Sequence, residues 1–148
     1  SQAADRQRVP DCRKAIANVL VKVLKAADVE PSQLGHIHAH GLATRLSDIA
    51  EAQAIRDVLG DEVAKVPVTT AKGHSGNLGA GSGLLELIAS VVALGHDSLF
   101  PILNLEALDP ECPVAAVAKS GASSGKCFVN LSVTPQGQAS AVLVRRYC

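Results

Sequence analysis

Residues 65–95 read KVPVTTAKGHSGNLGAGSGLLELIASVVALG, and this stretch decides the fold. The run from Lys65 to Thr70 is typical of a buried strand, although Pro67 restricts it to an end or an edge of a sheet. A glycine-rich turn from Gly73 to Gly83 follows, and a helix then continues to about Gly95. Strands that alternate with helices in this way are typical of a layered α/β domain.

The helix of this stretch has an unusual polar pattern. Its polar residues are Ser82, Glu86 and Ser90, which are spaced by four and therefore form one narrow stripe. The rest of its surface is apolar, which predicts a helix that is buried on nearly all sides. A single layered domain of 148 residues can hardly cover such a helix. We therefore expect a missing partner layer, from another chain or from the rest of a longer chain.

The flanking sequence extends the α/β pattern on both sides. Apolar residues with helical spacing follow Asp11, and Ser47 is a candidate N-cap for the next helix. Two alternating apolar runs joined by a turn predict a strand pair near the end of the chain. The expected order is helix, strand, helix, strand, helix and strand pair, over residues 11–27, 36–40, 48–59, 65–70, 82–95, 126–133 and 139–145. Residues 104–125 are expected to be mostly connection, and residues 1–9 a frayed start or a cloning remnant ahead of a domain at 10–148.

Composition excludes several classes of protein. The 14 basic and 14 acidic residues cancel, so no electrostatic footprint for nucleic acid or an anionic membrane is present. Two Phe, one Tyr and no Trp make a stacking platform for single-stranded nucleic acid improbable. Four cysteines without a Cys-x-x-Cys pair argue against a disulfide scaffold and favour the cytoplasm. The longest apolar stretch, residues 84–94, falls short of the ~20 residues that span a bilayer.

Three groups of residues are candidates for chemistry. Strand periodicity puts His36, His38 and His40 on one side, which would suit a metal-dependent hydrolase, although no His-Glu-x-x-His motif is present. The glycine-rich turn precedes a helix, as in anion sites, but matches neither nucleotide pattern. The third group is His40, Lys72 and Asn77, which follow two strands and are expected at one sheet edge.

Two segments of the chain carry a family resemblance. Residues 40–52 read HGLATRLSDIAEA, and residues 72–86 read KGHSGNLGAGSGLLE. They resemble, in order, the His-Gly-Thr-x-Thr to Gly-Asp-x-x-Glu segment and the Lys-to-His segment in the C-terminal half of a β-ketoacyl-acyl carrier protein synthase. Residues 100–105, FPILNL, and the following Asp109-Pro110 pair resemble a third family segment. The resemblance runs from about Cys12 to Val144 and implies the thiolase fold, a layered α/β half with a mixed sheet and a buried central helix.

The resemblance implies a role for each matching residue. In the family, a cysteine nucleophile holds an acyl group as a thioester, malonyl-carrier protein loses CO₂, and the resulting enolate attacks the thioester. His40 matches the histidine that hydrogen-bonds the malonyl thioester oxygen and so stabilises the enolate. Asn77 stands in place of a second histidine, and related condensing enzymes use a Cys-His-Asn set. Lys72 matches the site lysine, Glu51 the carboxylate that holds it, and Thr44 a threonine that contacts the phosphopantetheine arm.

The sequence also departs from the family pattern. Leu42 replaces the other pantetheine-contacting threonine, and residues 133–137 stand where the family has its Gly-Phe-Gly-Gly gate. His74, three residues before Asn77, is a candidate substitute for the second histidine. None of the four cysteines has the setting of the family nucleophile, at the start of a buried helix.

These observations predict a fragment of a longer enzyme that is inactive alone because the nucleophile lies in a missing N-terminal half. The resemblance implies acyl carrier protein as a partner, a homodimer at full length, no cofactor beyond the substrate's phosphopantetheine, no metal, no nucleic acid and no membrane. The activity it implies is an acyltransferase of fatty acid or polyketide synthesis. A non-elongating relative, such as a chain-length factor or a decarboxylating subunit, remains an alternative, with a His-rich metal-dependent hydrolase as a distant one.

Overall fold

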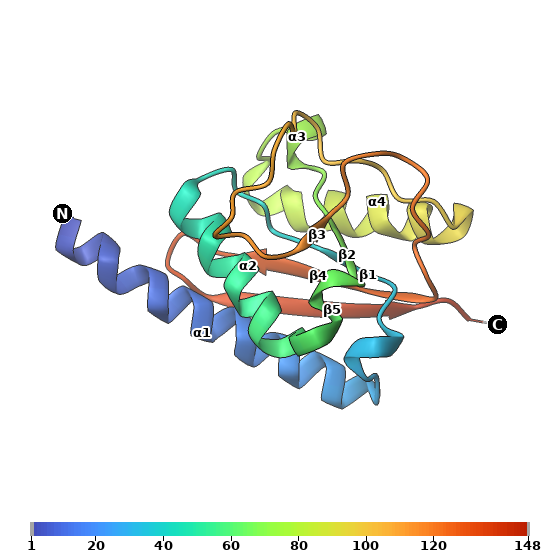
Figure 1. Ribbon diagram of the computed structural model, residues 1–148, viewed down its shortest axis with the longest axis horizontal. Coiled ribbons are helices and arrows are strands. Elements are labelled where there is room, and N and C mark those ends of the chain that lie inside the picture. Colours follow the sequence, from blue (N-terminus) through green and yellow to red (C-terminus); the bar gives the residue numbers. More distant parts are fainter. Residues whose placement is uncertain (1, 148) are drawn as a thin grey trace.

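The computed structural model describes the backbone of residues 2–147 and the side chains of residues 12–147. Helices and short helical turns alternate with strands along the chain, as Figure 1 shows. The helices are α1 (Gln2–Ala27), α2 (Arg45–Leu59), α3 (Lys72–Ser75) and α4 (Ser82–His96), with 3₁₀ turns η1 (Pro31–Gln33), η2 (Gly60–Ala64) and η3 (Gly79–Gly81). The strands are β1 (His36–His38), β2 (Pro67–Thr69), β3 (Ala115–Ala116), β4 (Cys127–Val133) and β5 (Ala139–Arg145).

The five strands form one mixed sheet in the order β3-β2-β1-β4-β5. The first four strands are parallel to their neighbours, and β5 is antiparallel to β4 as the second arm of the terminal hairpin. Pro67 is the first residue of β2, where its missing N–H removes no ladder hydrogen bond. The expected α/β architecture with a mixed sheet is confirmed. Strand β3 was not expected, because two alanines inside a long connection carry no strand periodicity.

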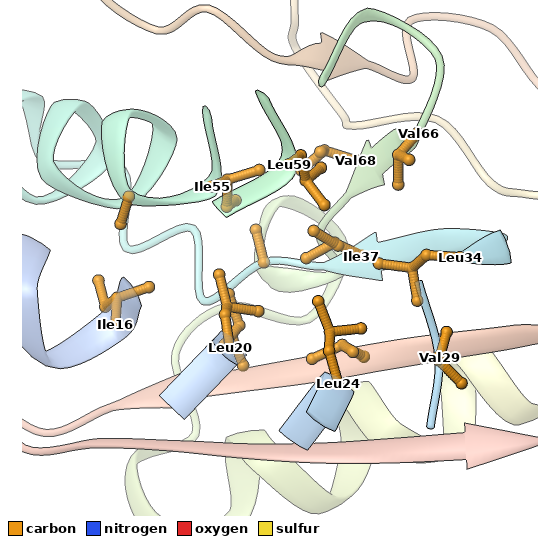
Figure 2. Close-up of a cluster of buried hydrophobic side chains, with 14 of the residues drawn as sticks. Ile16, Leu20, Leu24, Val29, Leu34, Ile37, Ile55, Leu59, Val66 and Val68 are labelled. Carbon is orange, nitrogen blue, oxygen red and sulfur yellow. The ribbon is translucent and has the colours of Figure 1, made fainter. Parts of the chain in front are cut away.

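The main hydrophobic core lies between the sheet and the α1–α2 pair. Figure 2 shows side chains of α1 facing Ile37 of β1 and Ile55 of α2 across this layer. The alternation of a strand separates the two faces of β1. Ile37 points into this core, whereas His36 and His38 point to the opposite face, where both bond to α4. The sheet thus separates an aliphatic layer from a polar one, and α1 and α4 lie on opposite sides of it (Figure 1).

Two helix starts differ from the sequence-based expectation. Helix α1 begins at Gln2, not Asp11, so residues 2–9 are helical. This stretch is rich in Ala, Gln and Arg, which are strong helix formers. Helix α2 begins at Arg45 with Thr44 as its N-cap in an extended conformation, whereas Ser47 is already inside the helix. Ser1 and Cys148 lie outside the described residues.

Helix α4 packs the other way round from an ordinary amphipathic helix. Its polar stripe, Ser82, Glu86 and Ser90, is buried against the sheet and its neighbouring loops. Its apolar face is open, with Leu84 at 64% exposure. The expectation of burial on nearly all sides is therefore wrong for this chain by itself. By length and composition alone, the segment Gly79–His96 is long and apolar enough to cross a membrane. This differs from the sequence analysis, in which the apolar stretch at residues 84–94 was too short. Within this segment Glu86 is 1% exposed and is paired with Lys72, so its acidic side chain faces the protein.

Candidate functional site

His40 stands two residues beyond the end of β1, where the chain turns away from the sheet. The turn depends on Gly41, whose φ of +52° favours glycine. A Cβ on Gly41 would lie 2.6 Å from Thr70 Oγ1, so the loop and the end of β2 approach closely here. Local sequence therefore fixes the half-buried His40 at the carboxyl edge of the parallel strands, as expected.

Lys72 lies directly behind His40. Its Nζ is 3.3 Å from His40 Nδ1 and 2.6 Å from the His40 carbonyl oxygen, and it forms an ion pair with Glu86 Oε1. The two side chains of this ion pair are 5% and 1% exposed. The three N–H bonds of the ammonium thus have three partners, and none remains for a substrate. In this structure Lys72 therefore contacts His40 and Glu86, and the catalytic role that the resemblance implies for it stays a prediction.

Glu51 has a different partner from the one expected. Its carboxylate accepts the His40 N–H at 2.6 Å and the Gly41 N–H at 3.0 Å. The predicted Glu51–Lys72 ion pair is wrong, because Glu86 on α4 takes the ammonium. Burial raises the pKa of Glu51 to about 7, against the lowering effect of these two N–H bonds. Glu51 nevertheless supports the site, since it holds the backbone on both sides of the His40 carbonyl.

The surroundings of His40 define its protonation state. The Lys72 ammonium can only donate, so Nδ1 of His40 must accept, and in the neutral ring the proton is on Nε2. Burial and the Lys72 charge lower the pKa of His40 to about 4. At neutral pH the ring is therefore an uncharged hydrogen-bond donor whose Nε2–H is directed away from Lys72.

Asn77 is held by its carbonyl end. Its Oδ1 accepts the Gly79 N–H at 3.1 Å and the Ser82 hydroxyl at 3.1 Å. This fixes the side-chain amide so that its NH₂ group is the free end, with two N–H donors. Ser82 belongs to the polar stripe of α4, so the helix orients the amide of Asn77 as Glu86 orients Lys72.

His40 and Asn77 line one cavity of about 1000 Å³. Thr44 lies in the same wall, and its hydroxyl donates to Ser47 at 2.7 Å. The turn at residues 133–137, expected at the acyl site, also lines this cavity. The structure therefore brings His40, Asn77, Thr44 and Glu51 to one space, with Lys72 behind it. The full lining is Cys12, Ile16, His40, Leu42, Thr44, Arg45, Leu46, Ser47, Ala50, Glu51, Asn77, Gly79, Ala80, Ser82, Gly83, Ser132, Val133, Thr134, Pro135, Gln136, Gly137 and Ser140.

The sequence analysis missed Cys12 as a residue of this cavity. Cys12 is half-buried and shares the cavity with His40. Burial and the charge of Glu51 raise the pKa of the Cys12 thiol. This is the reverse of what an activated thiolate needs. The available signal was the position of Cys12 on the inward stripe of α1, one turn before Ile16, which indicates burial but not contact with a cavity.

The other histidines do not join the site. His36 and His38 point toward α4, and the ring of His74 contacts the Pro101 carbonyl oxygen at 2.9 Å outside the cavity lining. Within the described part of the chain, no three His, Cys, Asp or Glu side chains gather as a metal site would require. The prediction of a three-histidine metal site and the substitution of His74 for Asn77 are both without support from this geometry.

The mixed sheet with helices on both faces, and a site at the carboxyl ends of β1 and β2, is similar to the thiolase-like fold of solved ketosynthases. Solved ketosynthases share it: a ketosynthase from Burkholderia phymatum superposes with a TM-score of 0.82 at 23% identity, over 91% of this chain and 33% of that one. The family model described as beta-ketoacyl synthase, C-terminal domain, matches residues 1–106. The chain belongs to the β-ketoacyl synthase family.

Two relatives illustrate this membership. The chain is 38% identical to 3-oxoacyl-[acyl-carrier-protein] synthase 2 of Synechocystis sp. over 70% of this chain and 25% of the relative. A solved type II polyketide ketosynthase, in complex with its acyl-carrier protein and bound to the hexaketide, superposes with a TM-score of 0.88 at 27% identity, over 94% of this chain and 34% of that one. The chain spans about a quarter of the length of the curated relatives that it matches.

Proposed function

We propose that this chain supplies the enolate-stabilising half of a β-ketoacyl synthase active site, in a longer enzyme that condenses an acyl thioester with malonyl-carrier protein. One observation carries the proposal. Lys72 donates to Nδ1 of His40, which leaves the neutral ring with an Nε2–H donor, and His40 and Asn77 both line the same cavity. Two fixed neutral donors at one cavity suit an oxygen that becomes negative during reaction.

The chemistry that fits these donors is decarboxylation followed by condensation. When malonyl thioester loses CO₂, the electron pair of the broken carbon–carbon bond moves toward the thioester carbonyl, and negative charge develops on its oxygen. The His40 and Asn77 N–H groups hydrogen-bond that oxygen and stabilise the enolate. The enolate carbon then attacks the carbonyl carbon of the acyl thioester, a carbon–carbon bond forms, and the nucleophile leaves as a thiolate.

The nucleophile must come from a segment other than the described residues. Cys12 is the one thiol among the cavity-lining residues, and the negative charge of Glu51 disfavours its ionised form. The open apolar face of α4 gives a second reason to place further protein next to this chain. We therefore propose that the chain alone loads no acyl group and condenses none.

Acyl carrier protein is the proposed carrier of both substrates. A cavity of about 1000 Å³ with Thr44 in its wall leaves room for a phosphopantetheine arm. The complex with acyl-carrier protein among the similar structures supports this assignment. The proposal needs no metal or cofactor beyond the thioester carried on that arm.

The test uses the longer synthase that we propose contains this chain, with purified acyl- and malonyl-carrier protein. Intact-mass measurement follows loading, and product analysis follows condensation. We expect His40→Ala to abolish condensation and to leave acyl loading unchanged, because the imidazole acts only after the acyl-enzyme has formed. His96→Ala, an exposed histidine at the end of α4, is the matched control. If His40→Ala also loses loading, the proposed role is wrong.

A non-elongating subunit is the second candidate, and three residue changes favour it. Asn77 and Leu42 replace family residues, and the turn at 133–137 has no phenylalanine. A solved ketosynthase/chain length factor is also similar, with a TM-score of 0.86 at 28% identity, over 92% of this chain and 34% of that one. Absence of any acyl gain in the folded longer protein, while malonyl-carrier protein is still decarboxylated, would favour this candidate.

A further inference from the structure

The polar stripe of α4 contacts residues of the site at two successive turns. Ser82 bonds Asn77 and Glu86 bonds Lys72, as described above. The third residue, Ser90, is fully buried and contacts neither of them. Its hydroxyl lies instead between two buried histidines of β1, 2.8 Å from His38 Nδ1 and 3.1 Å from His36 Nε2. The function proposed above gives this trio no task.

The direction of each hydrogen bond in the trio is determined from one end. The Ala71 N–H can only donate, and it lies 3.1 Å from His38 Nε2. That nitrogen therefore accepts, and the proton of a neutral His38 ring is on Nδ1, from which it is donated to Ser90 Oγ. A protonated His38 would direct a second N–H at the Ala71 N–H, so this geometry excludes the charged ring.

The other end of the chain of hydrogen bonds requires the same direction. The Ser124 carbonyl oxygen can only accept, and it lies 2.8 Å from His36 Nδ1. His36 therefore carries its proton on Nδ1 and accepts the Ser90 hydroxyl at Nε2. The ring of Phe128 stacks on the ring of His36, with the ring centroids 4.9 Å apart, and covers it on one side. Ser124 is itself held, since its backbone N–H donates to Asp97 Oδ1 at 3.1 Å.

The result is one directed series of hydrogen bonds, Ala71 N–H to His38 to Ser90 to His36 to the Ser124 carbonyl. Ser90 is the only member that both accepts and donates through a single atom, so the series depends on it. Ala71 is the N-cap of α3, and Lys72 is the next residue. Fixing the Ala71 N–H therefore fixes the start of the turn from which Lys72 reaches His40.

We propose that Ser90 is a positioning residue: through His38 and Ala71 it holds Lys72 in the place where Lys72 orients the His40 ring. This proposal rests on the proposed function in one respect only, namely that His40 stabilises an enolate. The hydrogen-bond series itself stands on geometry that does not involve the cavity. This proposal gives His36 and His38 a role that depends on the imidazole ring. Each ring uses one nitrogen as a hydrogen-bond donor and the other as an acceptor.

The first test is spectroscopic and uses the 148-residue chain labelled with ¹⁵N-histidine. Ring nitrogen chemical shifts at pH 7 distinguish the two neutral tautomers. We expect the Nδ1–H form for both His36 and His38 and the Nε2–H form for His40. Because free histidine prefers the Nε2–H form, two buried Nδ1–H rings are a specific result. An Nε2–H form at His38, or a charged ring at either position, would overturn the proposed series.

The second test changes Ser90 in two ways that differ in hydrogen bonding. Ser90→Cys nearly keeps the volume but supplies only a weak donor and acceptor, whereas Ser90→Thr keeps the hydroxyl and adds a methyl group. We expect Ser90→Cys to change the His38 ring signals and also those of His40, and Ser90→Thr to retain the wild-type tautomers. Ser32→Ala, an exposed serine, is the control. A His40 signal that is unchanged in Ser90→Cys while His38 shifts would overturn the positioning role.

The kinetic readout separates this proposal from the proposed function. In the longer synthase we expect Ser90→Cys to lower kcat by about tenfold to a hundredfold with KM for malonyl-carrier protein unchanged, because misplacement of a catalytic group costs rate and not binding. Ser90→Thr should restore most of the rate. If no variant of His40 affects condensation, the proposed function fails while the tautomer test still stands. If the tautomers are as expected and Ser90→Cys leaves kcat unchanged, the positioning proposal alone fails.

Discussion

The Nζ atom of Lys72 lies 2.6 Å from the carbonyl oxygen and 3.3 Å from Nδ1 of the same residue, His40. One cation thus fixes both the backbone and the ring of the proposed catalytic histidine. Glu51 holds the two N–H groups that flank that carbonyl. The His40 ring can therefore neither rotate freely nor exchange its tautomer without disturbing a buried charge. This arrangement explains why a surface cavity can present one well-defined N–H donor.

The buried ion pair behind His40 makes a stability prediction. Glu86→Gln leaves the Lys72 ammonium buried without its carboxylate, and we expect a loss of about 3 kcal/mol in the free energy of unfolding. Urea unfolding of the chain measures it, with the exposed Glu106→Gln as the control. Removal of both charges in Lys72→Met/Glu86→Leu should cost less than Glu86→Gln, since no buried charge is then left unpaired. A double variant that is less stable than Glu86→Gln would contradict this account.

The glycine after His40 allows a matched pair of variants. Gly41→Ala and Gly60→Ala both place a side chain at positive φ, +52° and +56°, where L side chains are strained. At Gly60 nothing lies within 4 Å of the new Cβ, whereas at Gly41 Thr70 Oγ1 lies 2.6 Å away. We expect both variants to lose stability in urea unfolding, but only Gly41→Ala to shift the His40 ring signals. Unchanged His40 signals in Gly41→Ala would mean that the loop does not approach Thr70 as closely as described.

The pH dependence of stability tests the neutral state of His38. Burial first, and then the charge of Lys72, lowers the pKa of His38 in the folded chain to about 3, against 6.5 as its ordinary value. Between pH 6.5 and pH 3 His38 binds a proton in the unfolded chain but not in the folded chain. The effect of His38 on the free energy of unfolding is therefore most favourable above pH 6.5, and the free energy of unfolding decreases as the pH falls toward 3. The slope from one proton is at most about 1.4 kcal/mol per pH unit.

The matching variant is His38→Gln, which keeps an acceptor for the Ala71 N–H but does not titrate. We expect its free energy of unfolding to fall less steeply than that of the wild type from pH 6.5 to 4.5, as measured by urea unfolding. The other titrating groups, including Glu51, are present in both proteins and cancel in the comparison. Ser32→Ala, at an exposed position, should retain the wild-type slope. Identical slopes for wild type and His38→Gln would show that His38 is not held neutral.

The open face of α4 predicts self-association of the isolated chain. Ile88 and Val92 are each 54% exposed on this face, next to Leu84. Contiguous apolar surface of this kind drives association in water. We expect light scattering to detect oligomers that Ile88→Lys weakens, whereas Val21→Lys, at a similarly exposed valine of α1, leaves them intact. A wild-type chain that is a clean monomer would count against the view that further protein covers α4.

Periodicity predicted the parts of the fold that bury one face. The spacing of Ile16, Leu20 and Leu24 located α1, and the alternation of Cys127, Val129 and Leu131 located β4. Element starts were less predictable, because Ser47 is the better N-cap by residue type, whereas the observed N-cap of α2 is Thr44. The orientation of α4 could not be inferred from polarity alone. Its polar stripe is inward because Asn77, Lys72 and His38 supply the hydrogen-bond partners, and these come from other elements.

The candidate site was predictable in membership but not in contacts. The resemblance located His40, Asn77, Lys72, Glu51 and Thr44. The structure places four of them in the lining of one cavity, with Lys72 behind His40. The sequence could not show which carboxylate pairs with Lys72, because Glu51 and Glu86 are both near in sequence to residues of the site. Cys12 was missed because a helical stripe does not show which of its residues meets a cavity. The pairing of His36 and His38 through Ser90 links β1 with α4, and no spacing rule predicts it.

The most direct test of the central claim is the rate of CO₂ release from malonyl-carrier protein by the acylated longer synthase. Each of His40 and Asn77 is assigned one donor to the enolate oxygen, and loss of one such donor costs about 10²- to 10³-fold in rate. We therefore predict that His40→Ala and Asn77→Ala each slow CO₂ release by at least a hundredfold while the acyl-enzyme still forms. CO₂ release at the wild-type rate in either variant would contradict the assignment of that residue as a donor to the enolate.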